Sequence, residues 1–310
     1  MRIALLCFAV LLLAACPNDA KKKSVERNNE GSKALGQKQY ETAINHFEES
    51  IKAWDENHMA WYGMGLAHSS RGNWKEAADA FTSAVKLKDD DAMYQMWLGR
   101  ALYEQSVKQA REEQAKKENK KPEEVEPDLR TVNFEPALQH LTAAVKINGE
   151  LWRAHYYLGR IYREQEKAKE AAEEFTRAIQ NNPRDYAPYV ALGELYRLWD
   201  YTDQAIQVTS QGTANVPGQN ERSEVYFVLG MAHARKKNLD KAIEAFSHAL
   251  EDRKDIQKAK FQRGKAYFEK GELAKAKKDL EEFNKSAGAD AGLDKSVANK
   301  MLMDIASQQI

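Results

Sequence analysis

The chain has 310 residues, of which 43% are hydrophobic and 30% are charged, with only 16 glycines and 7 prolines. This composition is typical of a folded protein rich in helix-forming residues and argues against a disordered chain. Because 47 Lys and Arg residues balance 47 Asp and Glu residues, no overall field favours nucleic acid or an anionic membrane as the partner.

The first sixteen residues differ sharply from the rest of the chain. Arg2 precedes an almost wholly apolar stretch over residues 3–13, which ends in Ala14-Ala15-Cys16. This pattern indicates a secretory leader. The alternative is a short membrane anchor, but a spanning helix needs about 18 or more apolar residues and this run is shorter.

The end of the leader, Leu13-Ala14-Ala15-Cys16, resembles the lipobox of bacterial lipoproteins. The resemblance implies that residues 1–15 are removed as a signal peptide and that Cys16 becomes the lipidated first residue, carrying acyl chains such as palmitate. A thiolate is a suitable nucleophile for the thioether to the lipid carrier, and several acyl chains on one cysteine anchor a protein stably to the membrane.

The other cysteine, Cys7, lies within the leader. The mature chain is therefore expected to hold no disulfide, which suits an oxidising compartment. Pro17 follows the lipobox where an Asp is associated with inner-membrane retention, so we expect an outer-membrane protein that faces the periplasm. Residues 16–23 are expected to form a lipidated N-terminus and an extended tether of roughly 25–30 Å.

Seven glycines mark an internal period in the main body of the chain. Six of them are followed twelve residues later by alanine, and in the third unit the matching residue is Ala137. Steps of 34 residues join the glycines within three groups, which are Gly31, Gly65 and Gly99, then Gly159 and Gly193, then Gly230 and Gly264. A fixed period of this length is typical of a helical repeat protein.

The repeat resembles the tetratricopeptide repeat, which has Trp-x2-Leu-Gly-x2-Tyr, then Ala-x3-Phe, then Pro. The best units contain Trp61, Gly65, Ala77 and Phe81 in the second repeat, and Leu158, Gly159, Tyr162, Ala171, Phe175 and Pro183 in the fourth. The resemblance implies an all-α, right-handed superhelical solenoid of about seven helical hairpins over residues 24–285. Residues 286–310 would add a C-terminal capping helix, with a partner-binding helix as the alternative.

Two units depart from the period. Gly99 and Gly159 are 60 residues apart, so the third unit carries an insertion over residues 104–133. We expect its first part to extend a helix to about Asn119, and Pro122 and Pro127 to force a loop. It is either a spacer or a contact element for a partner or the membrane. In the fifth unit, Thr209 and Gly212 predict a short or bent second helix.

The sequence favours a binding protein over an enzyme. The seven histidines include no pair at the spacing of a helical metal site, and no glycine-rich phosphate loop occurs. We therefore expect no catalytic residue, no metal, no cofactor and no small-molecule substrate. His68 and His233 replace a core aromatic residue of the repeat and are expected to be structural.

The resemblance implies that function lies on the concave surface, lined by the second, fifth, ninth and twelfth residues of each first helix. The fifth positions form an apolar column beside a row of arginines. The expected peptide-binding groove comprises Tyr62, Met96, Arg100, Arg153, Tyr156, Arg160, Arg163, Arg197, Phe227 and Phe261, with Val190 also in the column. Aromatic residues and arginines dominate binding hot spots, although the aromatic column could equally serve packing.

Two hypotheses for function follow. The first is a lipid-anchored scaffold that binds other envelope proteins through this groove and assists assembly of an outer-membrane complex, in the manner of pilotins or of secretion, pilus or motility machinery. The second is an adaptor that regulates peptidoglycan synthases or hydrolases. The repeat pattern does not choose between them.

Overall fold

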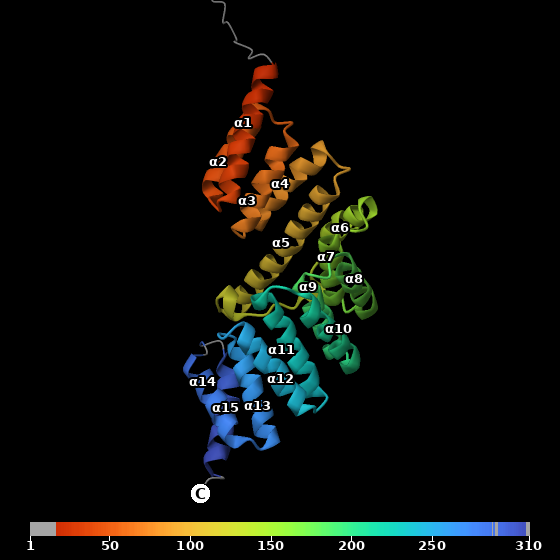
Figure 1. Ribbon diagram of the computed structural model, residues 1–310. Helices are drawn as coiled ribbons and strands as arrows, with labels where there is room; N and C mark the ends of the chain where they lie inside the picture. Colours follow the sequence, from red (N-terminus) through yellow and green to blue (C-terminus); the bar gives the residue numbers. More distant parts are fainter. Residues whose placement is uncertain (1–16, 287, 289–290, 308–310) are drawn as a thin grey trace, which may run out of the picture. The chain divides into compact units, whose positions relative to one another are not determined.

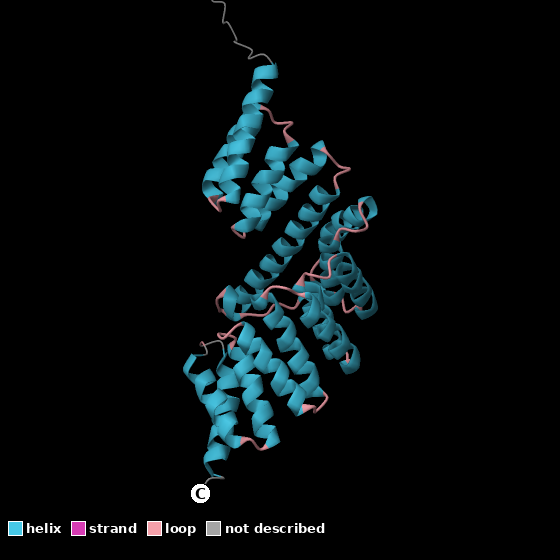
Figure 2. Cartoon of the chain, viewed as in Figure 1, coloured by secondary structure: helices cyan, strands magenta, loops and turns pink. Residues whose placement is uncertain are grey.

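The computed structural model describes residues 17–286, 288 and 291–307, and in this part of the chain every regular element is a helix (Figure 2). The α-helices are α1 Pro17–Gly36, α2 Tyr40–Ala53, α3 His58–Ser70, α4 Trp74–Leu87, α5 Ala92–Glu118, α6 Glu135–Ile147, α7 Trp152–Glu164, α8 Ala168–Asn181, α9 Tyr186–Leu198, α10 Thr202–Asn215, α11 Gln219–Arg235, α12 Leu239–Asp252, α13 Gln257–Lys270, α14 Leu273–Ser286 and α15 Gly292–Ser307. Two short 3-10 helices, η1 Pro122–Glu124 and η2 Leu129–Thr131, lie between α5 and α6.

The first fourteen helices follow as seven successive pairs, and α15 ends the described chain (Figure 1). This order confirms the predicted all-α repeat fold. The chain divides into two compact units, residues 1–105 and 106–310, with the boundary inside α5.

A glycine on the first helix faces a phenylalanine on the second in four of the hairpins. A Cβ added to Gly31, Gly65, Gly159 or Gly230 would lie 2.5–2.7 Å from the ring of the phenylalanine sixteen residues later. Those rings belong to Phe47, Phe81, Phe175 and Phe246, all of which are completely buried. The glycine period therefore exists because the ring of the second helix needs the space of a missing side chain.

The turn inside each regular hairpin holds one residue in the left-handed conformation, seven positions after the glycine. Lys38, Glu166, Asp200 and Lys237 adopt it with φ of 58–65°, and Gly72 and Gly271 with φ of 73° and 82°. A left-handed residue ends a helix and reverses the chain within a few residues. The conserved turn geometry aligns the second helix on the first in every one of these hairpins.

The expected tether is wrong for residues 17–23, because α1 begins at Pro17. Seven residues in a helix span roughly 10 Å, far less than an extended tether. Ser24 is buried in the first unit, where Ser50 donates a hydrogen bond from Oγ to its carbonyl oxygen over 2.7 Å. Asn57 donates from Nδ2 to Ser24 Oγ over 2.9 Å. These bonds fix the turn of α1 that follows the expected tether.

The inserted residues continue a helix and then form a loop with two short 3-10 helices. α5 continues to Glu118, and Asn119 then adopts a left-handed conformation with φ of 51°. The two proline-containing segments form η1 and the loop before η2, and Phe134 and Ala137 return to the buried core.

The second helix of the fifth repeat was expected to be short or bent, and the structure shows that it is not shortened. α10 has 14 residues, as many as α8 and α12. Thr209 donates from Oγ1 to the carbonyl of Ala205 over 2.6 Å, which satisfies its hydroxyl inside the helix. Gly212 lies against the ring of Tyr189, so its missing side chain admits a larger neighbour instead of breaking the helix.

The last helix covers the end of the second unit. α15 packs against α13 and α14 and buries Ala298 and Ile305, while Val297 and Met301 are partly buried against the same core. Leu293, in the first turn of α15, is exposed. Among the described residues, no helix has the length and apolar character needed to cross a bilayer.

Candidate functional site

A hollow of about 430 Å³ opens between the first helices of the fourth, fifth and sixth repeats. We call it the α9 hollow, because α9 lies between α7 and α11. Its lining comprises Tyr156, Arg163, Tyr186, Ala187, Val190, Ala191, Glu194, Asn220, Glu221, Glu224 and Arg253. The lining combines apolar and charged groups, as protein-binding surfaces commonly do.

The helical period brings these side chains together. Tyr156 and Arg163 stand seven residues apart on α7, and Val190 and Glu194 stand four apart on α9, so each pair shares one helix face. These residues occupy the fifth, ninth and twelfth positions that the sequence predicted for the concave surface. The structure therefore places Tyr156, Arg163 and Val190 in one hollow.

The lengthened α11 supplies the acidic side of the hollow. The glycine step from Gly193 to Gly230 is 37 residues instead of 34, and α11 has 17 residues where α9 has 13. Its added first turn carries Asn220 and Glu221 into the lining. This contribution was missed, although the longer step was the signal for it.

Glu224 and Arg253 form an ion pair in the lining of the hollow. Arg253 donates from Nη2 to Glu224 Oε1 over 2.6 Å, and Lys258 donates from Nζ to Glu224 Oε2 over 2.8 Å. Burial alone would raise the pKa of Glu224, but these hydrogen bonds and charges outweigh it and lower the pKa. Glu224 is therefore ionised at neutral pH and already paired, which leaves Glu194 and Glu221 as the acidic groups of the hollow without an ion pair in the described chain.

The arginine row does not form one cluster. Of the five predicted arginines, only Arg163 lines the α9 hollow, and it pairs with Glu164 over 2.7 Å. The others pack on rings or lie beside them, since Arg100 lies 4.8 Å from the Trp97 ring, Arg153 lies 4.4 Å from the Trp152 ring and Arg160 lies 5.5 Å from the Tyr157 ring. Arg197 is half-buried on α9 and does not line the hollow.

The aromatic column packs within its own hairpins. Ring centroids lie 5.9 Å apart for Tyr62 and Phe81, 6.0 Å for Tyr156 and Phe175, and 5.9 Å for Phe227 and Phe246. Two expected groove residues are buried outright, because Met96 has no exposed surface and Phe261 packs 4.9 Å from Phe283. Their assignment to the groove is wrong, since a side chain without exposed surface cannot meet a ligand.

No cluster of three His, Cys, Asp or Glu side chains suited to a metal ion occurs within the described residues.

Comparison with known families explains this architecture. Three family models, each described as tetratricopeptide repeat, match the chain. The first matches residues 28–92 and 63–113, the second matches residues 152–185 and 223–255, and the third matches residues 257–289. The matched segments together cover more than half of the chain. The chain belongs to the tetratricopeptide repeat family.

Solved structures share the fold of this tetratricopeptide repeat protein. The Cut9–Hcn1 hetero-tetramer of the APC/C matches with a TM-score of 0.57 at 18% identity, over 81% of this chain and 45% of that chain. PilF of Pseudomonas aeruginosa matches with a TM-score of 0.56 at 15% identity, over 78% of this chain and 96% of that chain. Yeast Tom70 matches with a TM-score of 0.53 at 13% identity, over 95% of this chain and 56% of that chain. No curated protein sequence matches the chain.

Family membership makes the chain a scaffold for protein–protein interactions, because stacked repeats present extended binding surfaces and such repeats are typically not catalytic. The repeat models leave residues 186–222 unmatched. That stretch contains α9, α10 and the first turn of α11, and it supplies Tyr186, Val190, Glu194 and Glu221 to the hollow. Part of the α9 hollow thus lies in a stretch that the repeat models do not match, and residues 114–151 are unmatched as well.

Proposed function

We propose that this tetratricopeptide repeat protein is a lipid-anchored scaffold of the bacterial cell envelope, which holds a segment of a partner protein in the α9 hollow. The observation that carries the proposal is the hollow itself, in which apolar surface from the fourth and fifth repeats meets unpaired carboxylates. Apolar anchors surrounded by polar groups are the usual anatomy of a protein-binding site.

The charges of the hollow define the partner segment. Arg163 on α7 contributes a cation that also pairs with Glu164, while Glu194 on α9 and Glu221 on α11 contribute carboxylates. A segment with an apolar side chain over Val190, a basic residue toward Glu194 and an acidic residue toward Arg163 would satisfy all three. A segment of mixed charge therefore suits the hollow better than a purely acidic one, because four of the five predicted arginines lie elsewhere.

The envelope location is supported by the sequence alone. The apolar leader and Cys16 motivate it, and both fall outside the described residues. Substituting Cys16→Ser in the full chain should move the protein from the membrane to the soluble fraction or leave the leader uncleaved. A cleaved variant that still sediments with membranes contradicts the lipid anchor.

The experiment for the hollow is site-specific photocrosslinking in cells. A photoreactive amino acid at Val190 should yield a defined adduct that mass spectrometry identifies, and the charge reversals Arg163→Glu with Glu194→Lys should abolish that adduct. The control is Lys236→Glu with Lys237→Glu, in the turn between α11 and α12, where both lysines are exposed and pair with Asp203 and Glu269. Loss of the adduct in the control alone rejects the hollow as the site.

The identity of the adduct also separates the two cellular roles. A subunit of an outer-membrane secretion, pilus or motility complex supports the assembly scaffold, which we prefer. A peptidoglycan synthase or hydrolase instead shows that the chain is an adaptor of cell-wall enzymes.

A further inference from the structure

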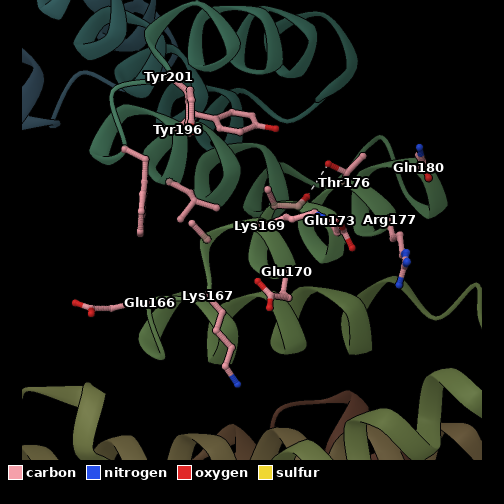
Figure 3. A pocket seen from close by; sticks show the side chains of 14 residues that line it. Glu166, Lys167, Lys169, Glu170, Glu173, Thr176, Arg177, Gln180, Tyr196 and Tyr201 are labelled. Carbon is pink, nitrogen blue, oxygen red and sulfur yellow. Dashed lines mark hydrogen bonds between the residues drawn. The ribbon is translucent and has the colours of Figure 1, made fainter.

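A second and larger surface lies along the second helix of the fourth repeat. A groove of about 780 Å³ runs between α8 and the end of α9, and it shares no lining residue with the α9 hollow. Figure 3 shows the charged side chains of α8 and of the turn before it, from Glu166 to Arg177, with Tyr196 and Tyr201 above them. We call this surface the α8 groove.

The turn after α9 is the unusual part of the groove. In the other regular hairpins the four residues of this turn are polar or glycine, as in Glu164-Gln165-Glu166-Lys167 and Arg235-Lys236-Lys237-Asn238. In the fifth repeat the same four positions read Leu198-Trp199-Asp200-Tyr201. Leu198 is 64% exposed, Trp199 49% and Tyr201 52%.

These side chains are not needed for the turn, since the other hairpins make the same left-handed turn without them. Exposed large apolar groups gathered at one place mark interaction surfaces. The groove floor is also apolar, because Ala168, Ala172 and Leu195 line it. The groove thus offers a place to bury an apolar side chain of a partner between α8 and Tyr196.

The charges along the groove favour a basic partner. Two of its three cations are already engaged, because Arg177 pairs with Glu174 over 2.7 Å and Lys167 lies 5.7 Å from the Tyr162 ring. Glu170 and Glu173 are exposed and have no ion pair within the described chain. Exposed tryptophan and tyrosine faces add a further attraction for cations.

The geometry points to the α8 groove as a second docking surface, which takes a short segment of another protein with an apolar anchor and neighbouring Lys or Arg side chains. The anchor fills the space between α8 and Tyr196, and the cation lies against Trp199 and the carboxylates of Glu170 and Glu173. With the α9 hollow, the fourth and fifth repeats would join two different partners, although the groove does not depend on the hollow being a site.

The test begins with selection of peptides. A phage-displayed library of random twelve-residue peptides is panned on the full chain and counter-selected on the Trp199→Ala variant. The expected survivors combine an apolar residue with Lys or Arg close by. The proposal is overturned if no family of peptides depends on Trp199, or if the dependent family is acidic.

A peptide from that family, labelled and synthesised, is then titrated by fluorescence anisotropy. Trp199→Ala should weaken its binding at least tenfold, and Glu170→Lys with Glu173→Lys should make the full chain prefer a matched peptide carrying Glu in place of each Lys and Arg. A reversal of preference is a readout that mere loss of structure does not produce. Circular dichroism checks that both variants keep their helix content.

The matched control carries the same charge change at the same two positions of another repeat. Glu76→Lys with Asp79→Lys alters α4 at the positions that Glu170 and Glu173 hold on α8. Binding should stay unchanged in this control, and an equal loss overturns the assignment to α8. Sedimentation velocity tests the other occupant, because concentration-dependent dimers that Trp199→Ala abolishes would assign the groove to a second copy of the chain.

Discussion

The ring of Phe175 occupies the space that a side chain on Gly159 would need. An added Cβ would lie 2.7 Å from two ring carbons. Non-bonded carbon atoms do not come this close, so the ring or the backbone would have to shift. Gly159→Ala should therefore lower the free energy of unfolding by about 1–3 kcal/mol through overpacking. Urea unfolding followed by circular dichroism measures the change. Gly36→Ala is the control, because nothing lies within 4 Å of that position.

A smaller side chain opposite the glycine should restore part of this loss. The seventh repeat already pairs Gly264 with Leu280, where an added Cβ would be 3.0 Å from the leucine. We expect Gly159→Ala combined with Phe175→Leu to be less destabilising than the sum of the single variants, with a coupling of about 1 kcal/mol. Strict additivity would contradict direct contact between the two side chains.

Phe175 itself should be among the most stabilising side chains of the second unit. It has no exposed surface and lies in a core cluster with Tyr189 and Leu192. Phe175→Ala should cost about 3–5 kcal/mol, because it removes a buried ring and leaves a cavity. A loss below about 1 kcal/mol in urea unfolding would show that the hairpin collapses around the site.

Because of His155, the fourth repeat should become less stable as the pH rises from 6 to 9. Its Nε2 donates to the carbonyl of Gly149 over 2.9 Å, and its Nδ1 faces Glu174 Oε2 at 2.6 Å. Burial alone would lower the pKa of His155, but the hydrogen bonds to Glu174 and Gly149 outweigh it and raise the pKa above its usual value. Both ring nitrogens are satisfied when the imidazole is protonated.

The sign of the pH dependence follows from that direction. The protonated ring contributes its full stability below about pH 6.5, and this contribution is lost as the pH rises through the raised pKa. The melting temperature of the full chain should therefore fall more steeply between pH 6 and pH 9 than the melting temperature of the His155→Gln variant. NMR titration of the ring gives the pKa directly, and a value below 6.5 contradicts the prediction.

His68 and His233 should act in the opposite direction. Each stands at the position of a repeat tyrosine, and its Nδ1 is buried with no hydrogen bond in the described chain. Burial lowers the pKa of both side chains, so each favours the neutral ring and loses stability as the pH falls below about 6.5. His233→Tyr should flatten the decline of the melting temperature between pH 7 and pH 5, and an unchanged slope would rule out this role.

Arg263 and Asp279 form the tightest ion pair between α13 and α14. Two parallel hydrogen bonds of 2.7 and 2.8 Å join them, and Asp279 is buried. Arg263→Met should cost about 3–5 kcal/mol because it strands a buried carboxylate, whereas Arg263→Met with Asp279→Leu should recover most of that loss. Chemical denaturation of the two variants decides, and equal losses would show that the guanidinium acts by packing alone.

The repeat core could be predicted from the sequence because its cause is local. Gly159 and Phe175 are sixteen residues apart and meet within one hairpin, so the same relation recurs along the chain and shows as a period. The extent of α10 could not be predicted, because Thr209 and Gly212 are weak helix formers by themselves. The carbonyl of Ala205 accepts the hydrogen bond of the Thr209 hydroxyl, and the ring of Tyr189 fills the space beside Gly212. Helix propensities do not include such contacts.

The lining of the α9 hollow was harder to predict than the core. Helical spacing placed Tyr156, Arg163 and Val190 on the face that lines the α9 hollow, but it could not show that Met96 and Phe261, in equivalent positions, are buried by their neighbours. Arg253 was missed because it lies beyond the end of α12 and reaches the hollow only through the fold. Position within a repeat fixes the face of a helix, whereas burial depends on the adjoining repeats.

The lengthened α11 also bears on how such an array diversifies. Three residues added between Gly193 and Gly230 extend a helix by roughly 4.5 Å, close to one turn. The insertion leaves the Gly230 and Phe246 contact of that hairpin intact. A small insertion at a junction can thus add residues to the proposed binding surface while the glycine–phenylalanine packing inside that hairpin remains unaltered.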